Sequence, residues 1–446
     1  MKSYPSYNDS GVEWIGKVPN EWSIVKYKSL GENIVDNIGT EDFKDKKVIH
    51  YSIPNVQSFG KGVMELGNDI KSSKLLFKGG ELIISKLNPR KSTVCIVEEF
   101  EDNIILGSGE FVVLYPKIMD SKYLYYFVIT SKYTDFLDSC VESVTRSHQR
   151  VNPSIIYNSY IPKPSEIEQT QIVSFLDTKT QKIDDLIEKT EQKIKLLKEK
   201  RTSLINHCVT KGLNPNVEMK DSGVEWIGEI PRDWDIKKIK YLKSSKKYSL
   251  VDGPFGSNLK TIHYVDDGDV YIIESGFITS GKFQYVRDFK TITNEHFETI
   301  KRSECNEGDI IISKIGEYYG MCGILPKLDK RTVISGNTVT LTISKNHNTK
   351  FIHQVIIQHR INGTFKKEVQ QTGQPFISLG VINNLIIPTP NLSEQTQIIE
   401  YLDEQTQKID STIEKETQRI ELLKEYRQSL ISEVVTGKVD VRDWKE

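Results

Sequence analysis

The sequence has few cysteines and no long apolar run. Its 446 residues include five cysteines, none in a CxxC pair: Cys95, Cys140, Cys208, Cys305 and Cys322. An odd, scattered set predicts neither a disulfide framework nor a zinc site and is typical of a reducing compartment. No apolar run approaches about 18 residues, so no transmembrane helix is expected. The segment after Met1 lacks the pattern of a signal peptide. We therefore expect a cytoplasmic protein.

Neither sign of charge is in excess. The chain carries 60 Lys and Arg against 61 Asp and Glu, a formal net charge of -1. Such a balance gives no general attraction to nucleic acid. Any contact with DNA must then come from local patches or be shared with a partner.

Motifs of catalysis are also missing from the sequence. The stretch GVEWIGKV at 11–18 is close to a phosphate-binding loop, but Val18 replaces the Ser or Thr that binds Mg²⁺, and the duplicate of this stretch has Glu229 in place of the Lys. The tetrapeptide of amino-methyltransferases, a glycine-rich cofactor loop and a metal-spaced His cluster are likewise not found. We expect no catalytic residue, metal or cofactor in this chain.

What the sequence does contain is a long segment present twice. Residues 162–210 recur as residues 388–436 without a gap, at an offset of 226 (388 minus 162), and both copies contain EQTQI, LD, TQKID, LLKE and VT. Each copy has apolar residues at heptad spacing, which predicts two long helices that pair as a coiled coil. The predicted seam comprises Leu176, Ile183, Ile187, Ile194, Leu197, Leu204, Leu402, Ile409, Ile413, Ile420, Leu423 and Leu430.

Polar residues interrupt the seam and mark the helix ends. Thr190 and Glu416 stand at one level and predict a register-setting role, while Arg201 and Arg427 predict a structural pairing. Ser165 with Glu168, and Asn391 with Glu394, have capping-box spacing, and Gly212 and Gly437 fit helix stops. Each helix would run about 45 residues, roughly 65 Å.

A second repeat precedes each middle block. DSGVEWIG at 9–16 and at 221–228 is followed by a proline and a tryptophan, at an offset of 212 (221 minus 9). We call these segments the tags. The second middle block is therefore 14 residues longer (226 minus 212). Trp14, Trp22, Trp226 and Trp234 of the tags could contact a partner or belong to the core, and the sequence does not decide between these.

The middle blocks match only in places. GELIISK at 80–86 corresponds to GDIIISK at 308–314, SGEFVVL to SGNTVTL, and KYLYYFVI to KFIHQVII. These pieces predict shared strands and helices, with different loops between them. We expect an α+β fold: two mixed α/β domains separated by two long antiparallel helices, with an internal pseudo-two-fold repeat. The predicted divisions are 1–161, 162–212, 213–387 and 388–446.

Together the tags, the P.P...EQ..I....D...I repeats and DGPFGSNLK at 252–260 resemble the specificity subunit of type I restriction-modification enzymes. The first block departs from the pattern, since IVDNIGTED stands where a second DGPFGS would be. The resemblance implies that each middle block is a target-recognition domain for half of a split site in double-stranded DNA. It also implies two methyltransferase subunits and restriction or motor subunits as partners, which would bind S-adenosylmethionine, ATP and Mg, and adenine methylation by the partner.

Loop residues able to pair with base edges or phosphates are the predicted DNA contacts. The DNA-binding residues that we predict are Lys86, Asn88, Arg90, Lys91, Arg146, His148, Gln149 and Arg150 in the first domain, and Ser257, Asn258, Lys260, Lys314, Tyr318, Tyr319, Asn337, Gln371 and Gln374 in the second. The lysine run between Lys237 and Lys247 could follow phosphates, although a charge run is more often a solvated face. Two other functions remain open: a coiled-coil adaptor that scaffolds two protein partners without binding DNA, and an enzyme with an unrecognised site.

Overall fold

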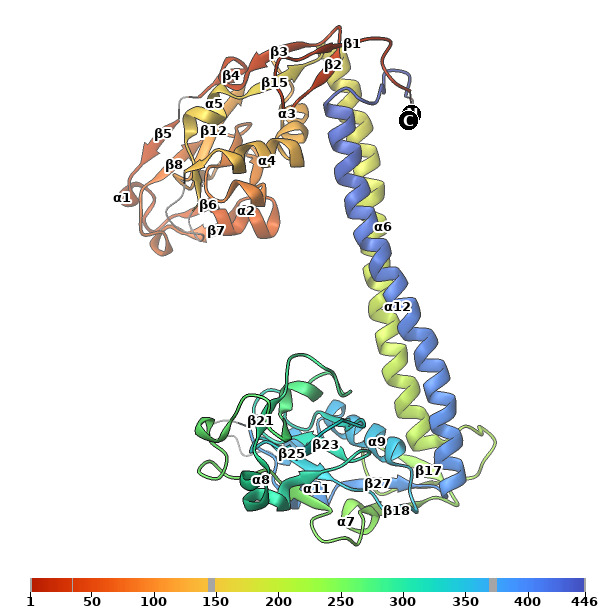
Figure 1. Ribbon diagram of the computed structural model, residues 1–446. Helices are drawn as coiled ribbons and strands as arrows, with labels where there is room; N and C mark the ends of the chain where they lie inside the picture. The colour runs from red at the N-terminus through yellow and green to blue at the C-terminus, as the bar shows by residue number, and fades with distance from the viewer. Residues whose placement is uncertain (1, 34, 143–148, 369–374, 445–446) are drawn as a thin grey trace. The chain divides into compact units, whose positions relative to one another are not determined.

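The computed structural model describes residues 2–33, 35–142, 149–368 and 375–444, which form two compact units. Unit 1 comprises Met1–Gln192 and Glu416–Glu446, and unit 2 comprises Lys193–Lys415. Each unit holds one tag, one middle block and half of each long helix (Figure 1). The duplication in the sequence is therefore a duplication of structure.

Unit 1 is built on a four-stranded and a five-stranded sheet, in the orders β10-β9-β12-β4 and β5-β8-β11-β6-β7. Its strands are β1 (Tyr7–Asp9), β2 (Lys17–Pro19), β3 (Ser23–Lys26), β4 (Gly31–Glu32), β5 (Asp36–Ile38), β6 (Lys47–Tyr51), β7 (Val63–Leu66), β8 (Lys74–Phe77), β9 (Leu82–Ser85), β10 (Val94–Ile96), β11 (Ile104–Gly107), β12 (Phe111–Pro116), β13 (Val141–Glu142), β14 (Arg150–Val151) and β15 (Tyr160–Lys163). Its shorter helices are α1 (Thr40–Phe43), α2 (Ile53–Phe59), α3 (Ser121–Val128), α4 (Ser131–Ser139) and α5 (Pro153–Asn158).

Unit 2 repeats the design with two four-stranded sheets, in the orders β19-β26-β23-β24 and β21-β20-β25-β22. Its strands are β16 (Met219–Asp221), β17 (Glu229–Pro231), β18 (Asp235–Lys238), β19 (Leu250–Asp252), β20 (Val270–Ile273), β21 (Lys290–Ile292), β22 (Glu304–Cys305), β23 (Ile310–Ser313), β24 (Cys322–Ile324), β25 (Arg331–Ile334), β26 (Thr338–Leu341) and β27 (Ile386–Thr389). Its shorter helices are α7 (Ile239–Leu242), α8 (Asn294–Ile300), α9 (Thr349–Ile361), α10 (Thr364–Glu368) and α11 (Leu379–Asn383).

The sequence pieces that match between the blocks become equivalent elements. β9 and β23 come from the two IISK stretches, β12 and β26 from the two SG stretches, and α3 and α9 from the matching helical segments. β9 pairs antiparallel with β12, and β23 with β26, in the same way, and β11 pairs parallel with β6 as β20 does with β25. The predicted α+β fold with an internal repeat is confirmed.

The opening strand differs between the units, where the sequence departs from the repeat. β4 pairs with Tyr115 and Pro116 near the end of β12, whereas β19 pairs with residues 339–341 along β26. After β19 the chain passes very close to the backbone of Ser335, and a Cβ added to Gly253 would lie 1.9 Å from the Ser335 carbonyl oxygen. Glycine is therefore required there for the close approach of two backbones.

Two long helices, α6 (Glu166–Lys211) and α12 (Leu392–Val435), lie side by side and antiparallel within each unit (Figure 1). In unit 1 Arg427 pairs with Asp184, with an Nε to Oδ1 distance of 2.8 Å. In unit 2 Arg201 pairs with Asp410 at the same 2.8 Å. Both residues of one pair are displaced by 226 from the other pair (427 minus 201, 410 minus 184). The two arginines thus have the predicted structural role: each helix contributes one arginine, which binds an aspartate of the other helix through two hydrogen bonds.

The predicted seam residues lie on the inner side of the helices. Leu176, Ile183, Leu402, Ile409, Ile420 and Leu430 are buried, and the other six seam residues are half-buried. Thr190 is buried, and its hydroxyl donates a hydrogen bond to the Leu186 carbonyl at 2.7 Å. The hydroxyl is therefore satisfied within its own helix. The coil is therefore held by a narrow apolar stripe and by charge pairs at its edge.

Each long helix begins with the predicted N-cap, but the predicted capping box is wrong in one respect. The Glu168 amide donates to Ser165 Oγ at 3.3 Å and the Glu394 amide to Asn391 Oδ1 at 3.0 Å. The glutamate side chains turn away from their caps, one to Tyr4 before the first tag and the other to Trp234 of the second tag. Glu168 accepts from the Tyr4 hydroxyl at 2.6 Å and Glu394 from the Trp234 indole at 3.1 Å, because these buried donors need a partner.

The glutamine after each of these glutamates is a buried clamp. Gln169 accepts from the Asp120 amide at 2.8 Å and donates to the Pro164 carbonyl at 2.9 Å. Gln395 accepts from the Asn348 amide at 2.8 Å and donates to the Pro390 carbonyl at 2.8 Å. Asp120 and Asn348 are the N-caps of α3 and α9. Each long helix thus positions the main helix of its own middle block.

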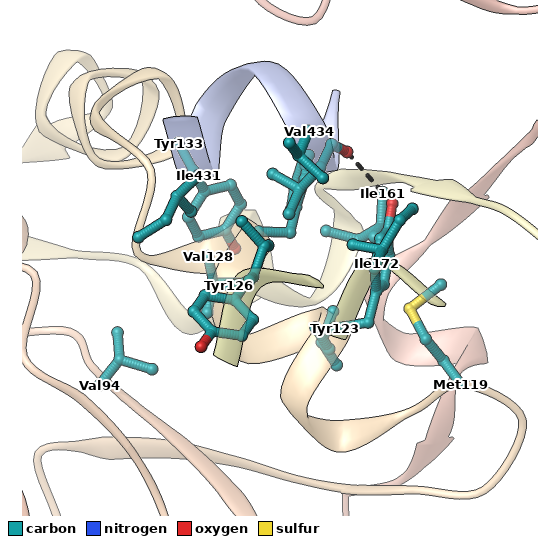
Figure 2. Packing of buried hydrophobic residues seen from close by; sticks show 14 of the residues in the cluster. Val94, Met119, Tyr123, Tyr126, Val128, Tyr133, Ile161, Ile172, Ile431 and Val434 are labelled. Carbon is teal, nitrogen blue, oxygen red and sulfur yellow. Dashed lines mark hydrogen bonds between the residues drawn. The ribbon is translucent and has the colours of Figure 1, made fainter. Parts of the chain in front are cut away.

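The core of unit 1 joins the middle block to both long helices (Figure 2). Tyr123 and Tyr133 from α3 and α4 pack with Ile172 of α6 and with Ile431 and Val434 of α12. The Tyr123 hydroxyl also donates to the Val435 carbonyl at 3.1 Å. Burying each such side chain contributes about 1.5–3 kcal/mol. The middle block and the coil therefore form one cooperative unit.

The tags are hairpins that belong to these cores. β1 pairs with β2 and β16 with β17, so GVEWIGKV is a hairpin loop and not the strand-to-helix turn of a nucleotide site. Trp22 and Trp234 are 6% and 1% exposed. Trp14 stacks on Phe136 with ring centroids 4.9 Å apart. The four tag tryptophans thus pack within their own units.

We expect Gln169→Leu to destabilise unit 1 by about 1–3 kcal/mol, because the Asp120 amide and the Pro164 carbonyl would be left buried without a partner. Gln181→Leu, on the exposed side of α6, is the matched control and should change stability by less than about 0.5 kcal/mol. Urea unfolding and amide hydrogen exchange in residues 120–128 would measure both. Equal effects of the two substitutions would contradict the clamp.

Unit 2 should be more sensitive to acid than unit 1. Burial lowers the pKa of His359 to about 4, and its Nε2 donates to the Ile386 carbonyl at 2.7 Å. The unfolded state therefore takes up the proton first, and stability falls as the pH drops from about 6.5 to about 4, by roughly 3 kcal/mol. In unit 1 Tyr133 lies against the tag residue Trp14, as His359 lies against Trp226 in unit 2, with ring centroids 5.7 and 4.7 Å apart. Urea unfolding from pH 7 to pH 4 should show a shallower decline in His359→Gln, and an unchanged decline would refute the assignment.

Candidate nucleic-acid interface

In each unit the segment after the central strand meets a distant loop, and we call this place the corner. In unit 1 Leu87 forms an isolated antiparallel bridge with Arg150, and the Val151 amide donates to the Lys86 carbonyl at 2.9 Å. In unit 2 Ile315 forms the same bridge with Phe376, and the Ile377 amide donates to the Lys314 carbonyl, again at 2.9 Å. The two corners share one backbone frame.

The third segment of each corner is the turn before the next strand. The Lys86 amide donates to the Glu110 carbonyl at 3.0 Å, and the Lys314 amide donates to the Asn337 carbonyl at 3.0 Å. The structure therefore brings Lys86, Asn88, Gln149 and Arg150 together in unit 1. It brings Lys314 and Asn337 together in unit 2.

The side chains of the unit 1 corner are polar and already paired. Arg150 binds Glu110 with two hydrogen bonds, at 2.8 and 3.1 Å, and the Lys86 ammonium donates to the Gly109 carbonyl at 2.8 Å. Asn88 has φ +49, a left-handed conformation that asparagine tolerates. The Gln149 Oε1 atom is buried and has no hydrogen-bond partner among the described residues. Arg90 and Lys91 are exposed in the adjoining turn.

The unit 2 corner is centred on a buried lysine. The Lys314 side chain is 4% exposed, and its Nζ lies 3.4 Å from Asp252 Oδ2. Arg302 contacts the other oxygen of Asp252 at 3.1 Å. The same ammonium lies 5.1 Å from the ring centroid of Phe255 and 5.7 Å from that of Phe376. One carboxylate and two aromatic rings thus hold this cation in place.

Other predicted contacts lie on the loops next to the unit 2 corner. Ser257, Asn258 and Lys260 are exposed on the loop after β19, where the Asn258 carbonyl accepts from His296 Nε2 at 2.9 Å. Tyr318 is 45% exposed, whereas Tyr319 is half-buried with the Arg360 guanidinium 5.3 Å from its ring centroid. These side chains line the loops on either side of the corner.

Four predicted contacts lie outside the described residues: Arg146, His148, Gln371 and Gln374. Sequence reasoning also missed five residues of the corners: Glu110, Asp252, Arg302, Phe255 and Phe376. Phe255 stands inside the DGPFGSNLK motif, which was a usable signal. Arg302 and Phe376 reach Asp252 and Lys314 only through the fold, and no local pattern marks them.

The lysine run of unit 2 begins in β18 and continues through α7 and beyond it. Lys237, Lys238 and Lys240 line a groove of about 590 Å³ together with Tyr241 and His347. Lys237 also pairs with Asp235 at 3.1 Å. The groove could accept a phosphate, and the ion pair with Asp235 reduces the charge available for it.

The described ranges hold neither a cluster of metal ligands nor a membrane-spanning helix. Within them, no group of three or more His, Cys, Asp or Glu side chains could hold a metal ion. In the same part of the chain, no helix is long and apolar enough to cross a membrane.

Two domains with one frame and different corner side chains, carried on a paired-helix scaffold, define a modular target-recognition protein. The chain belongs to the family of the type I restriction modification DNA specificity domain, whose model matches residues 19–196 and 255–424. It is a specificity subunit of a type I restriction-modification system and serves in DNA sequence recognition. The predicted family is confirmed.

Relatives and solved structures agree. The MjaVIII specificity subunit of Methanocaldococcus jannaschii is 27% identical, over 73% of this chain and 72% of that protein. The MjaX specificity subunit of the same organism, described as putative, is 22% identical over 96% of each. A chain from work on assembly and conformational transition of the type I R-M system has a TM-score of 0.73 at 14% identity, covering 95% of this chain and 99% of that one. The HsdS subunit from Thermoanaerobacter tengcongensis gives 0.55 at 14%, covering 95% and 98%. These structures share the fold.

We expect Asp252→Ala to destabilise unit 2 by about 2–3 kcal/mol, because it leaves the buried Lys314 ammonium and Arg302 without their shared counter-charge. Lys314→Met should cost about 1 kcal/mol or less, since Asp252 keeps Arg302 and the methionine fills the same space between the rings. Urea unfolding of the two variants gives the comparison. A larger loss in Lys314→Met than in Asp252→Ala would show that the cation, and not the carboxylate, organises the corner.

Proposed function

We propose that this chain is the non-catalytic subunit that gives a type I restriction-modification complex its specificity for a bipartite DNA site with a fixed spacer. One observation carries the proposal: the two corners have the same backbone bonds and different side chains. Two such readers in one chain suit a double-stranded site with two different halves. Adenine methylation and restriction would be performed by the partners.

The partners and their cofactors follow from the same proposal. Two methyltransferase subunits would bind S-adenosylmethionine, and restriction or motor subunits would bind ATP and Mg. The methyltransferase would also flip the target adenine out of the duplex, as enzymes acting on a base within a duplex do. The whole complex would work in the cytoplasm.

The long helices would fix the spacer between the half-sites. α6 is one uninterrupted helix of 46 residues, about 69 Å at about 1.5 Å per residue. A continuous helix paired along an apolar seam resists a change in its length. A coiled-coil adaptor that does not bind DNA would use the same helices, but it gives no reason for two corners with different polar and aromatic side chains.

Exchange of the first middle block, residues 23–161, for that of a related subunit should change one half of the methylated sequence and leave the other half and the spacer unchanged. The reason is that each block is held to its own end of the helices by bonds to backbone atoms. Methylation-sensitive sequencing of cellular DNA reads the result, and exchange of residues 235–387 is the reciprocal control. A change in both halves after either exchange would refute two independent readers. If the parent chain with its partners shows no sequence-specific binding of DNA, the adaptor function is favoured.

A further inference from the structure

The unit 2 corner exposes two aromatic rings, each of which contacts the Lys314 ammonium but leaves about half or more of its surface in water. Phe255 is 63% exposed and Phe376 is 46% exposed, although both lie beside a buried lysine. A phenylalanine that stays in water forgoes most of the roughly 1.5–3 kcal/mol that its burial would contribute. Two such rings at one corner indicate a surface that becomes buried when a partner binds.

The backbone around the rings is fixed. The Gly253 amide donates to the Thr338 carbonyl at 3.0 Å, and the Asn258 amide closes a turn on the Phe255 carbonyl at 2.7 Å. Phe376 is held by its backbone bridge to Ile315 and by the hydrogen bond that the neighbouring Ile377 amide donates to the Lys314 carbonyl. The rings are therefore presented from two anchored segments, which lowers the entropy cost of ordering them on a partner.

The equivalent corner of unit 1 shows what this position does. Arg150 occupies the place of Phe376 (376 minus 226), on the same bridge, and it is paired with Glu110. One corner thus presents an ion-paired guanidinium and the other two rings, on one frame. A position that keeps its backbone while its side chain changes from charged to aromatic is suited to discriminating between targets.

The charges nearby favour DNA as the occupant. Both oxygens of Asp252 are engaged by Lys314 and Arg302, so this carboxylate is neutralised before a phosphate arrives. Lys260 is exposed on the same loop as Phe255. Phenyl rings can contact the thymine methyl group in the major groove or insert between base steps. Both contacts use the apolar surface of a base.

We propose that Phe255 and Phe376 form an aromatic pair that contacts the apolar surface of bases in the second half-site, with Lys314 as the positioning residue between the rings. The proposal rests on the proposed function and adds the side chains that set specificity in the second domain. It also assigns the first corner a polar contact, through Arg150 and Glu110.

The test uses the full chain co-expressed with its methyltransferase and reads methylated sites by sequencing. Phe255→Ala with Phe376→Ala should lower the preference for the cognate base at one or two positions of one half-site by about 5- to 100-fold, the range found when stacking side chains are removed. The other half-site should be unchanged. Phe59→Ala is the matched control, because Phe59 is also 63% exposed but lies in unit 1, and it should leave the second half-site intact.

Two DNA probes distinguish the kinds of contact. Replacing thymine by uracil in the second half-site removes only the methyl group. If this weakens DNA binding by the parent complex but not by the double variant, the rings contact the thymine methyl group in the major groove. A rise in 2-aminopurine fluorescence that the double variant abolishes indicates insertion between bases. Either result supports the aromatic pair. The absence of both effects refutes it.

The failures are separable. If the unaltered chain directs no site-specific methylation, the proposed function fails and the aromatic pair fails with it. If the unaltered chain directs a bipartite pattern and the double variant keeps the same bases at the same preference, only the aromatic pair is refuted. Both phenylalanines are largely exposed, so the double variant should fold, and its thermal unfolding should show only the small loss caused by removing the two ring contacts with the Lys314 ammonium.

Discussion

The structure depends on one buried polar contact that occurs twice, the glutamine at the start of each long helix. Gln169 and Gln395 are almost completely buried, and each accepts from a helix N-cap amide and donates to a proline carbonyl. A buried amide left unpaired costs about 1–3 kcal/mol, so this position tolerates few replacements. The glutamates beside them bind Tyr4 and Trp234, and the arginines further along join the helices. The helix repeats are thus the part of the chain that orders everything else.

This explains why the fold could be predicted from the sequence. Residues that are identical in the two copies include many with fixed structural partners: Asp177 with Lys122, Asp403 with Lys350, and the seam residues with one another. A duplicated pattern at heptad spacing therefore predicts the paired helices, and β-branched runs between turns predict the sheets. The N-caps were correct but the glutamate half of each capping box was wrong, because spacing alone does not show that a donor elsewhere in the fold competes for the glutamate.

The corners could be predicted only in part. Lys86 and Lys314 follow the same strand in both blocks and were found from that match, and both carry a corner. The pairing of Arg150 with Glu110 could not be predicted, because it joins residues 40 positions apart across a fold whose register the sequence does not give. Phe376 was missed for the same reason, and also because an aromatic residue in a loop is ordinarily interpreted as core.

The middle blocks could diverge because the clamps act on backbone atoms. Gln169 binds the amide of an aspartate and Gln395 the amide of an asparagine, and an amide is present whatever the side chain. The corner bonds are also between backbone atoms, so Phe376 can stand where Arg150 stands without loss of the frame. The side chains at positions 150 and 376 can therefore differ without changing the corner frame, whereas those of the helix clamps cannot. A protein built in this way can change what it reads while keeping the scaffold that carries its readers.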